Sequence, residues 1–294
     1  PQKGKHMKFS AETEREAKSR IPRSETFLLT FIITCLMVVT GCTCLTPASI
    51  PTKVQEVRPG ILQGYLPPDK APNSLTLLPA PPAKESAAFA ADQEAFRTTR
   101  SLTNTARWKQ AIQDANLRFP EAAKVFSCAL NAQVTKDATP NLYMLLQRTS
   151  TDASVAALAA KRNYKRVRPF VVYKQTSCTP DWENDMKQDG SYPSGHTSIG
   201  WTWALILAEI APDRADAILS RGYAFGQSRV ICGVHWQSDV IAGRVIGAAV
   251  VAKLHSDPVF RAQLEAAKKE LAAAQAKGLQ PTIDRKAEAA ASSF

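Results

Sequence analysis

The sequence predicts an all-α fold: a single helical domain with buried central helices, preceded by an extended, proline-rich arm. Three observations predict this class. From residue 87 onward Ala, Leu, Glu, Lys and Gln dominate, and no segment shows the convincing apolar/polar alternation of a half-buried strand. The larger apolar residues recur at helical spacing instead. Residues 43–85 are rich in Pro, Ser and Thr, which leaves little room for regular helix.

The helical segments differ in how deeply they should be buried. Residues 194–210 and 236–254 hold few charges and are too short to span a bilayer, so we expect two mostly buried helices. Asp257 followed by Pro258 is typical of a helix start. Gly233 is placed to end the helix predicted over residues 213–231. The predicted segments cover residues 94–117, 141–164, 194–210, 213–231, 236–254 and 259–277.

Composition divides the chain of 294 residues into four parts. The length allows one large domain or two small ones, and the absence of an internal repeat favours one. The expected parts are a leader over residues 1–42, the arm over 43–85, the helical domain over 86–277 and a C-terminal tail over 278–294.

The leader has the features of an export signal. Residues 27–40 form an uncharged apolar run behind Arg20 and Arg23. The run ends in Val-Thr-Gly-Cys42, which resembles a bacterial lipobox, and a rival cleavage site follows Ala48. We therefore expect export to the periplasm, with a lipid anchor on Cys42 if the lipobox is used. Contact with the membrane is expected only through this signal or lipid.

The charge balance predicts an anionic partner. The formal net charge is +11 and the isoelectric point is near 9.5, which suits phosphate, nucleic acid or a membrane surface. The sequence has no RNA-binding signature, no zinc-finger spacing and no basic helix with heptads, so we expect no nucleic-acid partner.

The cysteines of the domain leave two interpretations open. An oxidising compartment would allow two of Cys128, Cys178 and Cys232 to pair, whereas the simpler interpretation is three buried, small apolar residues. No Cys-x-x-Cys pattern or Cys/His cluster predicts a metal site.

The first cluster of residues that could take part in binding or catalysis is a basic run that ends in Arg168 and Pro169. Lys161 and Arg168 are seven residues apart, so a helix would place them two turns apart on nearly the same face, with Pro169 ending it. By itself, such a run is more often a solvated basic surface.

The second cluster, Pro193-Ser194-Gly195-His196, lies at a helix start. Free backbone N–H groups there bind oxyanions, a serine adds a hydroxyl, and a glycine lets an anion come close. By itself, the cluster also fits a capped turn with an incidental histidine.

The third cluster joins Ser228-Arg229 to His235 and Asp239. A carboxylate four residues after a histidine can hold one imidazole nitrogen and leave the other free to attack. By itself, the pair also fits a structural hydrogen bond.

Taken in order, Lys-x6-Arg-Pro, Pro-Ser-Gly-His and Ser-Arg-x5-His-x3-Asp resemble the signature of the type 2 phosphatidic acid phosphatase superfamily, which includes the vanadium haloperoxidases. The stretches "GSYPSGHTSIGW", "GYAFGQSRVICGVHWQSDV" and "NSLTLLPAPPAKESAAFAADQEAF" resemble the class A bacterial non-specific acid phosphatases. This likeness runs from about residue 60 to residue 275.

The resemblance implies a mechanism with a phosphohistidine intermediate. His235 attacks phosphorus while Asp239 orients it, and His196 protonates the leaving alcohol and then activates water. The phosphoryl group is held by Lys161, Arg168, Ser194, Gly195 and Arg229. Because three of these side chains are fixed cations, no metal or other cofactor is needed.

The resemblance also implies how the enzyme is used. We expect a broad range of phosphomonoester substrates including nucleotides, an acidic optimum, and transfer of phosphate when an alcohol replaces water. Inorganic phosphate or vanadate should inhibit. The family forms homo-oligomers, so we expect one here.

If the three clusters meet in one site, two of the cysteines should also lie near it. Cys178 lies between the first two clusters and Cys232 lies within the third, so both should be near the site. We predict a Cys178–Cys232 disulfide that leaves Cys128 outside the pair.

Three other functions compete with hydrolysis. An oxidase would hold vanadate on His235. An integral lipid phosphatase would need further apolar runs of about 20 residues, which the sequence lacks beyond the leader. A phosphate-binding lipoprotein without catalysis would require neither histidine nor Asp239.

Overall fold

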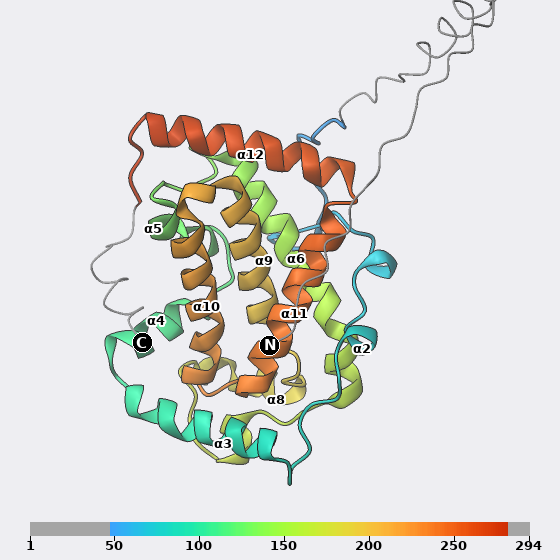
Figure 1. The fold of residues 1–294 in the computed structure, drawn as a ribbon, viewed down its shortest axis with the longest axis vertical. Coiled ribbons are helices and arrows are strands. Elements are labelled where there is room, and N and C mark those ends of the chain that lie inside the picture. Colours follow the sequence, from blue (N-terminus) through green and yellow to red (C-terminus); the bar gives the residue numbers. More distant parts are fainter. Residues whose placement is uncertain (1–47, 282–294) are drawn as a thin grey trace, which may run out of the picture. The chain divides into compact units, whose positions relative to one another are not determined.

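A computed structural model of the protein describes residues 48–281, and most of this part is helical (Figure 1). The expected all-α class is confirmed. The only strands among the described residues, β1 (Glu56–Arg58) and β2 (Ile61–Leu62), form one antiparallel hairpin in the arm. The predicted leader with Cys42 lies outside the described residues, as does most of the predicted tail.

The core is built around helix α9 (Gly195–Ile210). It packs against α6 (Pro140–Tyr164), α10 (Ala215–Ile231) and α11 (Gln237–Leu254), as Figure 1 shows. Trp203 and its neighbours on α9 are fully buried, as expected for this segment. Within residues 48–281, no helix combines the length and apolar character needed to cross a membrane.

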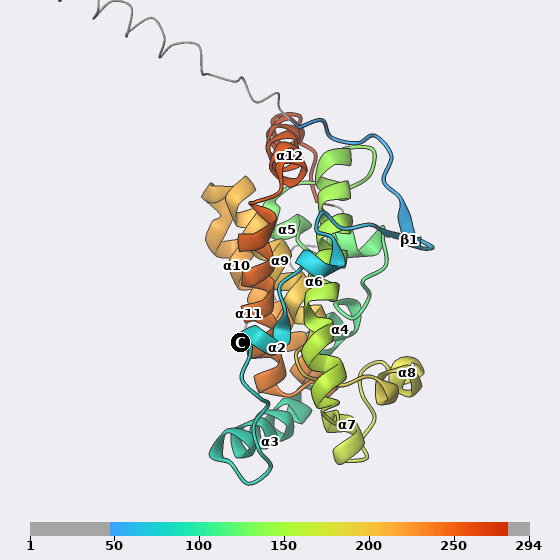
Figure 2. The ribbon, with the colours of Figure 1, turned by 90° about the vertical axis from the view of Figure 1, so that its right-hand side faces the viewer.

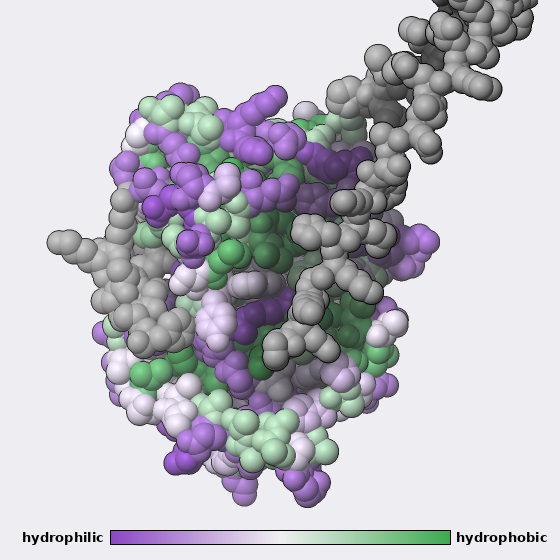
Figure 3. Space-filling model, in the orientation of Figure 1, coloured by the Kyte–Doolittle hydropathy of each residue, from purple (hydrophilic) through white to green (hydrophobic). Residues whose placement is uncertain are grey.

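Helix α12 (Pro258–Ala276) crosses one end of this bundle (Figures 1 and 2). Its apolar side packs mainly on α6, and hydrophilic side chains cover it at the top of the face in Figure 3. As predicted, Asp257 caps this helix: its carboxylate accepts a hydrogen bond from the Phe260 amide at 2.7 Å. Gly233, with φ of +79°, follows the end of α10, as predicted.

Helices α9 and α11 approach closely because α11 carries glycines at the contact. A Cβ on Gly243 would lie 2.6 Å from the Ser194 carbonyl oxygen, and one on Gly247 would lie 2.8 Å from that of Ser198. Both distances are too short for any side chain. The glycines therefore allow the two helices to start side by side, at the end of the bundle away from α12 (Figure 1).

The predicted helix over residues 94–117 is wrong as a continuous element. The chain forms α3 (Ala87–Thr99), a 3-10 turn η3 (Arg100–Leu102) and then α4 (Ala106–Gln113). The break has a local cause, because Asn104 has a positive φ of 65° and the Thr105 side chain accepts a hydrogen bond from the Trp108 amide.

The expectation that Lys161 and Arg168 share one helix is also wrong. Helix α6 ends at Tyr164, and Lys165 adopts a left-handed conformation with φ of 43°. Arg168 is the N-cap of the next short helix, α7 (Pro169–Val172), so Pro169 starts a helix rather than ending one.

The arm contains more regular structure than expected. Besides the hairpin it forms a short helix, α2 (Ser74–Leu77), and it runs beside α6 (Figure 2). The Asp152 carboxylate of α6 accepts hydrogen bonds from the backbone amides of Tyr65 and Leu66 at 3.0 and 2.9 Å. The remaining short elements are η2 (Pro68–Lys70), η4 (Glu121–Lys124), α5 (Ser127–Leu130), η5 (Pro180–Trp182), α8 (Glu183–Gln188) and η6 (Pro212–Arg214).

Cys178 and Cys232 form a disulfide, which is the pairing expected from the sequence, and Cys128 lies outside it. The Cys178 amide also donates a hydrogen bond to the Cys232 carbonyl oxygen at 2.9 Å. The disulfide joins the segment after α7 to the end of α10 and so ties two of the three predicted clusters together.

The close contact of α9 with α11 predicts the effect of one methyl group. Gly243→Ala should lower the free energy of unfolding by about 1–3 kcal/mol, although alanine favours the helix by about 1 kcal/mol. Ala248→Ser adds an atom on the exposed side of the same helix and should change stability by less than about 0.5 kcal/mol. Urea unfolding measures both, and a Gly243→Ala protein as stable as the wild type would contradict the close packing.

Candidate active site

The residues predicted from the three clusters come from the ends of separate helices. Lys161 lies in the last turn of α6, Arg168 caps α7, and Arg229 lies in the last turn of α10. Ser194, Gly195 and His196 start α9, His235 lies in the loop before α11, and Asp239 lies in the first turn of α11. The structure brings all of them to one end of the bundle.

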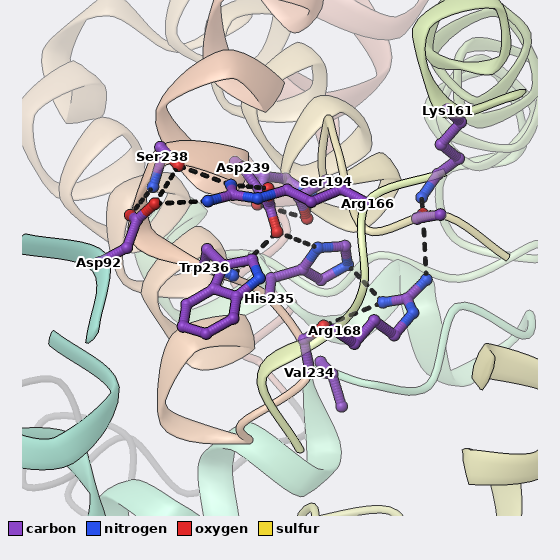
Figure 4. Close-up of polar contacts among 12 residues, drawn as sticks. Asp92, Lys161, Arg166, Arg168, Ser194, Val234, His235, Trp236, Ser238 and Asp239 are labelled. Carbon is purple, nitrogen blue, oxygen red and sulfur yellow. Dashed lines mark hydrogen bonds and ion pairs between the residues drawn. The ribbon is translucent and has the colours of Figure 1, made fainter. Parts of the chain in front are cut away.

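His235 and Asp239 form the centre of the site (Figure 4). The imidazole Nδ1 lies 3.4 Å from Asp239 Oδ2, and both side chains are buried. Burial and the nearby cations, Arg168 first, lower the pKa of His235 well below its ordinary value. A neutral imidazole with its proton on Nδ1 leaves the lone pair on Nε2, which lies 3.2 Å from Arg168 Nη1.

Lys161 and Arg168 are held in place by backbone carbonyl groups. Lys161 Nζ donates to the Gly190 carbonyl oxygen at 2.6 Å, and Arg168 donates to those of Met186 and Val234 at 2.9 and 3.0 Å. Burial and Arg168 lower the pKa of Lys161 to about 8, so it remains a cation at acidic pH.

Sequence reasoning missed a carboxylate that touches both cations. Asp189 Oδ2 lies 3.3 Å from Lys161 Nζ and 3.4 Å from Arg168 Nη2. The Asp189 side chain is 52% exposed, unlike the cations it touches. No motif in the sequence distinguished Asp189 from the other polar residues that precede Gly190.

Arg229 is the most deeply buried cation of the site. Its side chain is 1% exposed, and Nε and Nη1 have no hydrogen-bond partner among the described residues. Burial, then repulsion from Arg168, lowers its pKa. Buried donors without an acceptor are costly, so this guanidinium is suited to an anionic ligand.

The start of α9 is a capped helix N-terminus with room beside Gly195. Ser194 Oγ accepts hydrogen bonds from the Thr197 amide and hydroxyl at 3.3 and 3.0 Å, so the simpler interpretation of a capped turn also holds. At Gly195, an added Cβ would meet Lys161 Cε at 3.8 Å, an ordinary contact. Packing therefore does not demand a glycine there, whereas close approach of a ligand would.

His196 is half-buried at the edge of the site. Its Nε2 lies 3.0 Å from the Ala115 carbonyl oxygen, to which it can donate. Burial and Arg229 lower its pKa well below the ordinary value, and the Ala115 carbonyl opposes this shift. Burial and Arg229 both favour the neutral imidazole.

Two buried ionic networks behind the site were not predicted. In one, Arg166 bridges Asp92 and Asp239 (Figure 4). In the other, Ser228 of the third cluster donates to Asp114 at 2.6 Å and accepts from Arg107 at 2.9 Å, so its hydroxyl is structural. Arg166 lies within the basic run that drew attention to Lys161, whereas nothing in the sequence pointed to Asp92 or Asp114.

The arrangement provides concentrated positive charge and one oriented imidazole. Arg168 contacts Nε2 of His235, and Lys161 and Arg229 lie close enough to lower the pKa of this imidazole. All three side chains can donate hydrogen bonds to the oxygens of a tetrahedral dianion. Among residues 48–281 there is no group of three or more His, Cys, Asp or Glu side chains that could hold a metal ion.

Comparison with known proteins agrees with this geometry. Residues 141–261 match the family model described as "PAP2 superfamily". The chain is 46% identical over 209 residues to a non-specific acid phosphatase of Providencia stuartii, an alignment that covers 71% of this chain and 84% of the relative. It is 41% identical over 211 residues to a non-specific acid phosphatase of Salmonella typhimurium, with the same coverage of both chains.

A third relative extends the comparison. An acid phosphatase of Zymomonas mobilis is 43% identical over 197 residues, which cover 67% of this chain and 75% of the relative. Each of these alignments spans at least three quarters of the relative, and each relative is named as an acid phosphatase. The chain therefore belongs to the non-specific acid phosphatases of the PAP2 superfamily.

Proposed function

We propose that this protein hydrolyses a broad range of phosphomonoesters, nucleotides included, through a phosphohistidine at His235. The observation that carries the proposal is the position of His235 Nε2: it faces Arg168, while Nδ1 faces the Asp239 carboxylate. A neutral imidazole oriented in this way has its nucleophilic lone pair directed at a site lined by cations.

The first step transfers the phosphoryl group to the enzyme. Its oxygens take the hydrogen bonds of Lys161, Arg168 and Arg229, and Arg168 thereby turns from Nε2 to the substrate. The Nε2–P bond forms as the bond from phosphorus to the ester oxygen breaks, and His196 gives its proton to that oxygen. Asp239 stabilises the positive charge that develops on His235.

The second step returns the enzyme to its first state. Water attacks phosphorus, the Nε2–P bond breaks, and the water proton passes to His196, which has become a base. When an alcohol takes the place of water, the same step makes a new phosphomonoester. Phosphotransfer thus needs no additional residue.

The electrostatics of His196 support activity at acidic pH. Without substrate, burial lowers the pKa of His196 most, and Arg229 is the cation that lowers it most. A bound phosphoryl dianion offsets those cations, so the pKa of His196 rises and the imidazole takes up a proton. The acid is therefore charged only when there is a leaving group to protonate, and more readily at lower pH.

We further propose that the enzyme is exported to the periplasm and carries a lipid on Cys42 if the leader ends there. The Cys178–Cys232 disulfide supports an oxidising compartment. By the same family resemblance we expect a homo-oligomer.

The two histidines can be separated by mutation. His235→Ala should lose turnover by about 10⁴-fold or more and form no acid-labile phosphoenzyme, because the nucleophile is gone. His196→Ala should slow alkyl phosphates by about 10²–10⁴-fold and esters of good leaving groups much less in the first step. Since no base then activates water, phosphohistidine should accumulate in His196→Ala with an activated ester.

Quenching in alkaline detergent, where phosphohistidine is stable, after mixing with ³²P-labelled substrate measures both variants, and loss of the label on later acid treatment identifies the phosphohistidine. His255→Ala is the matched control, because this histidine contacts Glu209 on the surface and lies outside the site. Label retained by His235→Ala would refute the nucleophile, and an equal loss for all leaving groups in His196→Ala would refute the acid.

The cationic site also predicts the response to chelators and to vanadate. Activity should be unchanged by EDTA, because Lys161, Arg168 and Arg229 supply the charge that a metal would otherwise provide. Vanadate should inhibit competitively, since it adopts the trigonal-bipyramidal geometry of the transferring phosphoryl group. Steady-state assays test both, and a loss in EDTA that a divalent ion restores would contradict the mechanism.

A further inference from the structure

Behind His235 lies a buried ionic network that no motif of the family signature includes. We propose that Arg166, itself held by Asp92, is a positioning residue that fixes the Asp239 carboxylate and thereby sets the reactivity of His235. The inference rests on the proposed role of His235 as the nucleophile, and it assigns a function to a segment that looks, in sequence, like part of a basic surface.

The guanidinium of Arg166 bridges two carboxylates from different parts of the fold. Nη1 lies 2.6 Å from Asp239 Oδ1, and Nη2 lies 2.7 Å from Asp92 Oδ2 (Figure 4). The side chains of Arg166, Asp92 and Asp239 are 9%, 2% and 0% exposed. Hydrogen bonds between buried charged groups in this geometry are strong and directional.

The two oxygens of Asp239 have separate partners. Oδ1 accepts the hydrogen bond of Arg166, whereas Oδ2 accepts from the Trp236 amide at 2.8 Å and faces His235 Nδ1 at 3.4 Å. Holding Oδ1 fixes the rotation of the carboxylate, so Oδ2 remains directed at the imidazole. Without Arg166, Oδ1 would lose this partner and the Trp236 amide would be left to hold Oδ2, so the carboxylate would be less firmly directed at His235.

Asp92 in turn fixes Arg166 relative to α11. Its Oδ1 accepts a hydrogen bond from the Ser238 amide at 2.7 Å, and its Oδ2 accepts one from the Ser238 hydroxyl at 2.6 Å. Arg166 Nη1 also donates to that hydroxyl at 2.7 Å. The Asp92 carboxylate of α3 therefore holds two things in place. One is the first turn of α11, which carries Asp239, and the other is Arg166, which binds Asp239.

Aromatic rings enclose the arginine. The guanidinium carbon lies 5.4 Å from the centroid of the Trp236 ring and 5.8 Å from that of Phe89. These rings limit the rotamers of Arg166 and separate it from bulk water. A lysine would keep the charge but could not grip both carboxylates in one plane.

Arg166 differs from the phosphate-binding cations in how its donors are used. Nη1 and Nη2 are both engaged by carboxylates, whereas Arg229 has donors without a partner among the described residues. Loss of Arg166 should therefore affect the chemical step and leave the binding of phosphate almost unchanged.

The network also predicts a pH effect of definite sign. Burial raises the pKa of Asp239, and Arg166 opposes this more than any other group. The other titratable or charged groups near Asp239 are His235, Lys161, Arg168 and Tyr192. With Arg166 removed, Asp239 would take up a proton at a higher pH, so the acid limb of kcat should move upward in pH.

The test compares Arg166→Met, Arg166→Lys and Asp92→Asn with the wild type. Residues that hold the ligands of a metal site in position are typically worth about 10–100-fold. Since Arg166 holds Asp239 in a similarly indirect way, we expect kcat to fall by about that factor in Arg166→Met and by somewhat less in Asp92→Asn. KM and inhibition by phosphate should change by less than about 3-fold. Arg166→Lys should keep the acid limb of the wild type, because it keeps the charge.

Surface residues of α3 provide matched controls. Glu94→Gln and Arg97→Met remove one carboxylate and one guanidinium from an exposed pair on the same helix as Asp92, and they should leave kcat and its pH profile unchanged. If Arg166→Met fails to fold, the nearly isosteric Asp92→Asn and the charge-conserving Arg166→Lys carry the same comparison.

A double-mutant cycle with Asp239→Asn separates positioning from general damage. If Arg166 acts through Asp239, then Arg166→Met or Asp92→Asn should cost less than about 3-fold when Asp239 is already Asn. Losses that multiply, a raised KM with kcat unchanged, or an acid limb that does not move would overturn the proposal. A fully active Asp239→Asn enzyme, or label absent from His235 in the wild type, would instead overturn the proposed function itself.

Discussion

The structure depends on holding Lys161, Arg168 and Arg229 beside one another with little exposure to water. Burial of like charges is costly, and after burial itself Arg168 lowers the pKa of both Lys161 and Arg229. Part of the cost is offset by carbonyl oxygens and by the half-exposed Asp189. The proposed function would offset the remainder, because a phosphoryl dianion bound among the three cations would neutralise their repulsion.

The fold provides this arrangement by making helix ends converge. Gly243 and Gly247 let α11 start against α9, and the Ser194 amide donates to the Asp239 carbonyl oxygen at 2.9 Å. The disulfide fixes the segment after α7 to the end of α10. Since each functional residue lies at or next to the end of a helix, the rigid bundle sets the site geometry, and the arm and α12 stabilise the bundle from outside.

How far the sequence predicted the site depends on the range of the interactions. Residues in local motifs, such as Ser194 at its helix start and His235 before Asp239, were identifiable because a short spacing along the chain is enough to place their functional groups near one another. Asp92, Arg166 and Asp189 were not, since their roles come from contacts between distant segments. The helix ends were predicted where a glycine or Asp-Pro marks them, as at Gly233 and Asp257. The break between α3 and α4 was missed, because the left-handed conformation of Asn104 is one that its residue type permits but does not demand.

If Lys161, Arg168 and Arg229 hold a phosphoryl dianion, an anion in the site should bring a proton onto His196, and proton uptake on binding measures this. Sulfate is a tetrahedral dianion that does not titrate near neutral pH, so protons taken up on its binding belong to the protein. Calorimetry in two buffers of different ionisation enthalpy, at about pH 6.5, should give an uptake of about 0.5–1 proton per site. His196→Gln should bind sulfate with a clearly smaller uptake, of which the remainder belongs to His235, whose pKa the same cations lower. No uptake by the wild type, or the same uptake by His196→Gln, would contradict the account.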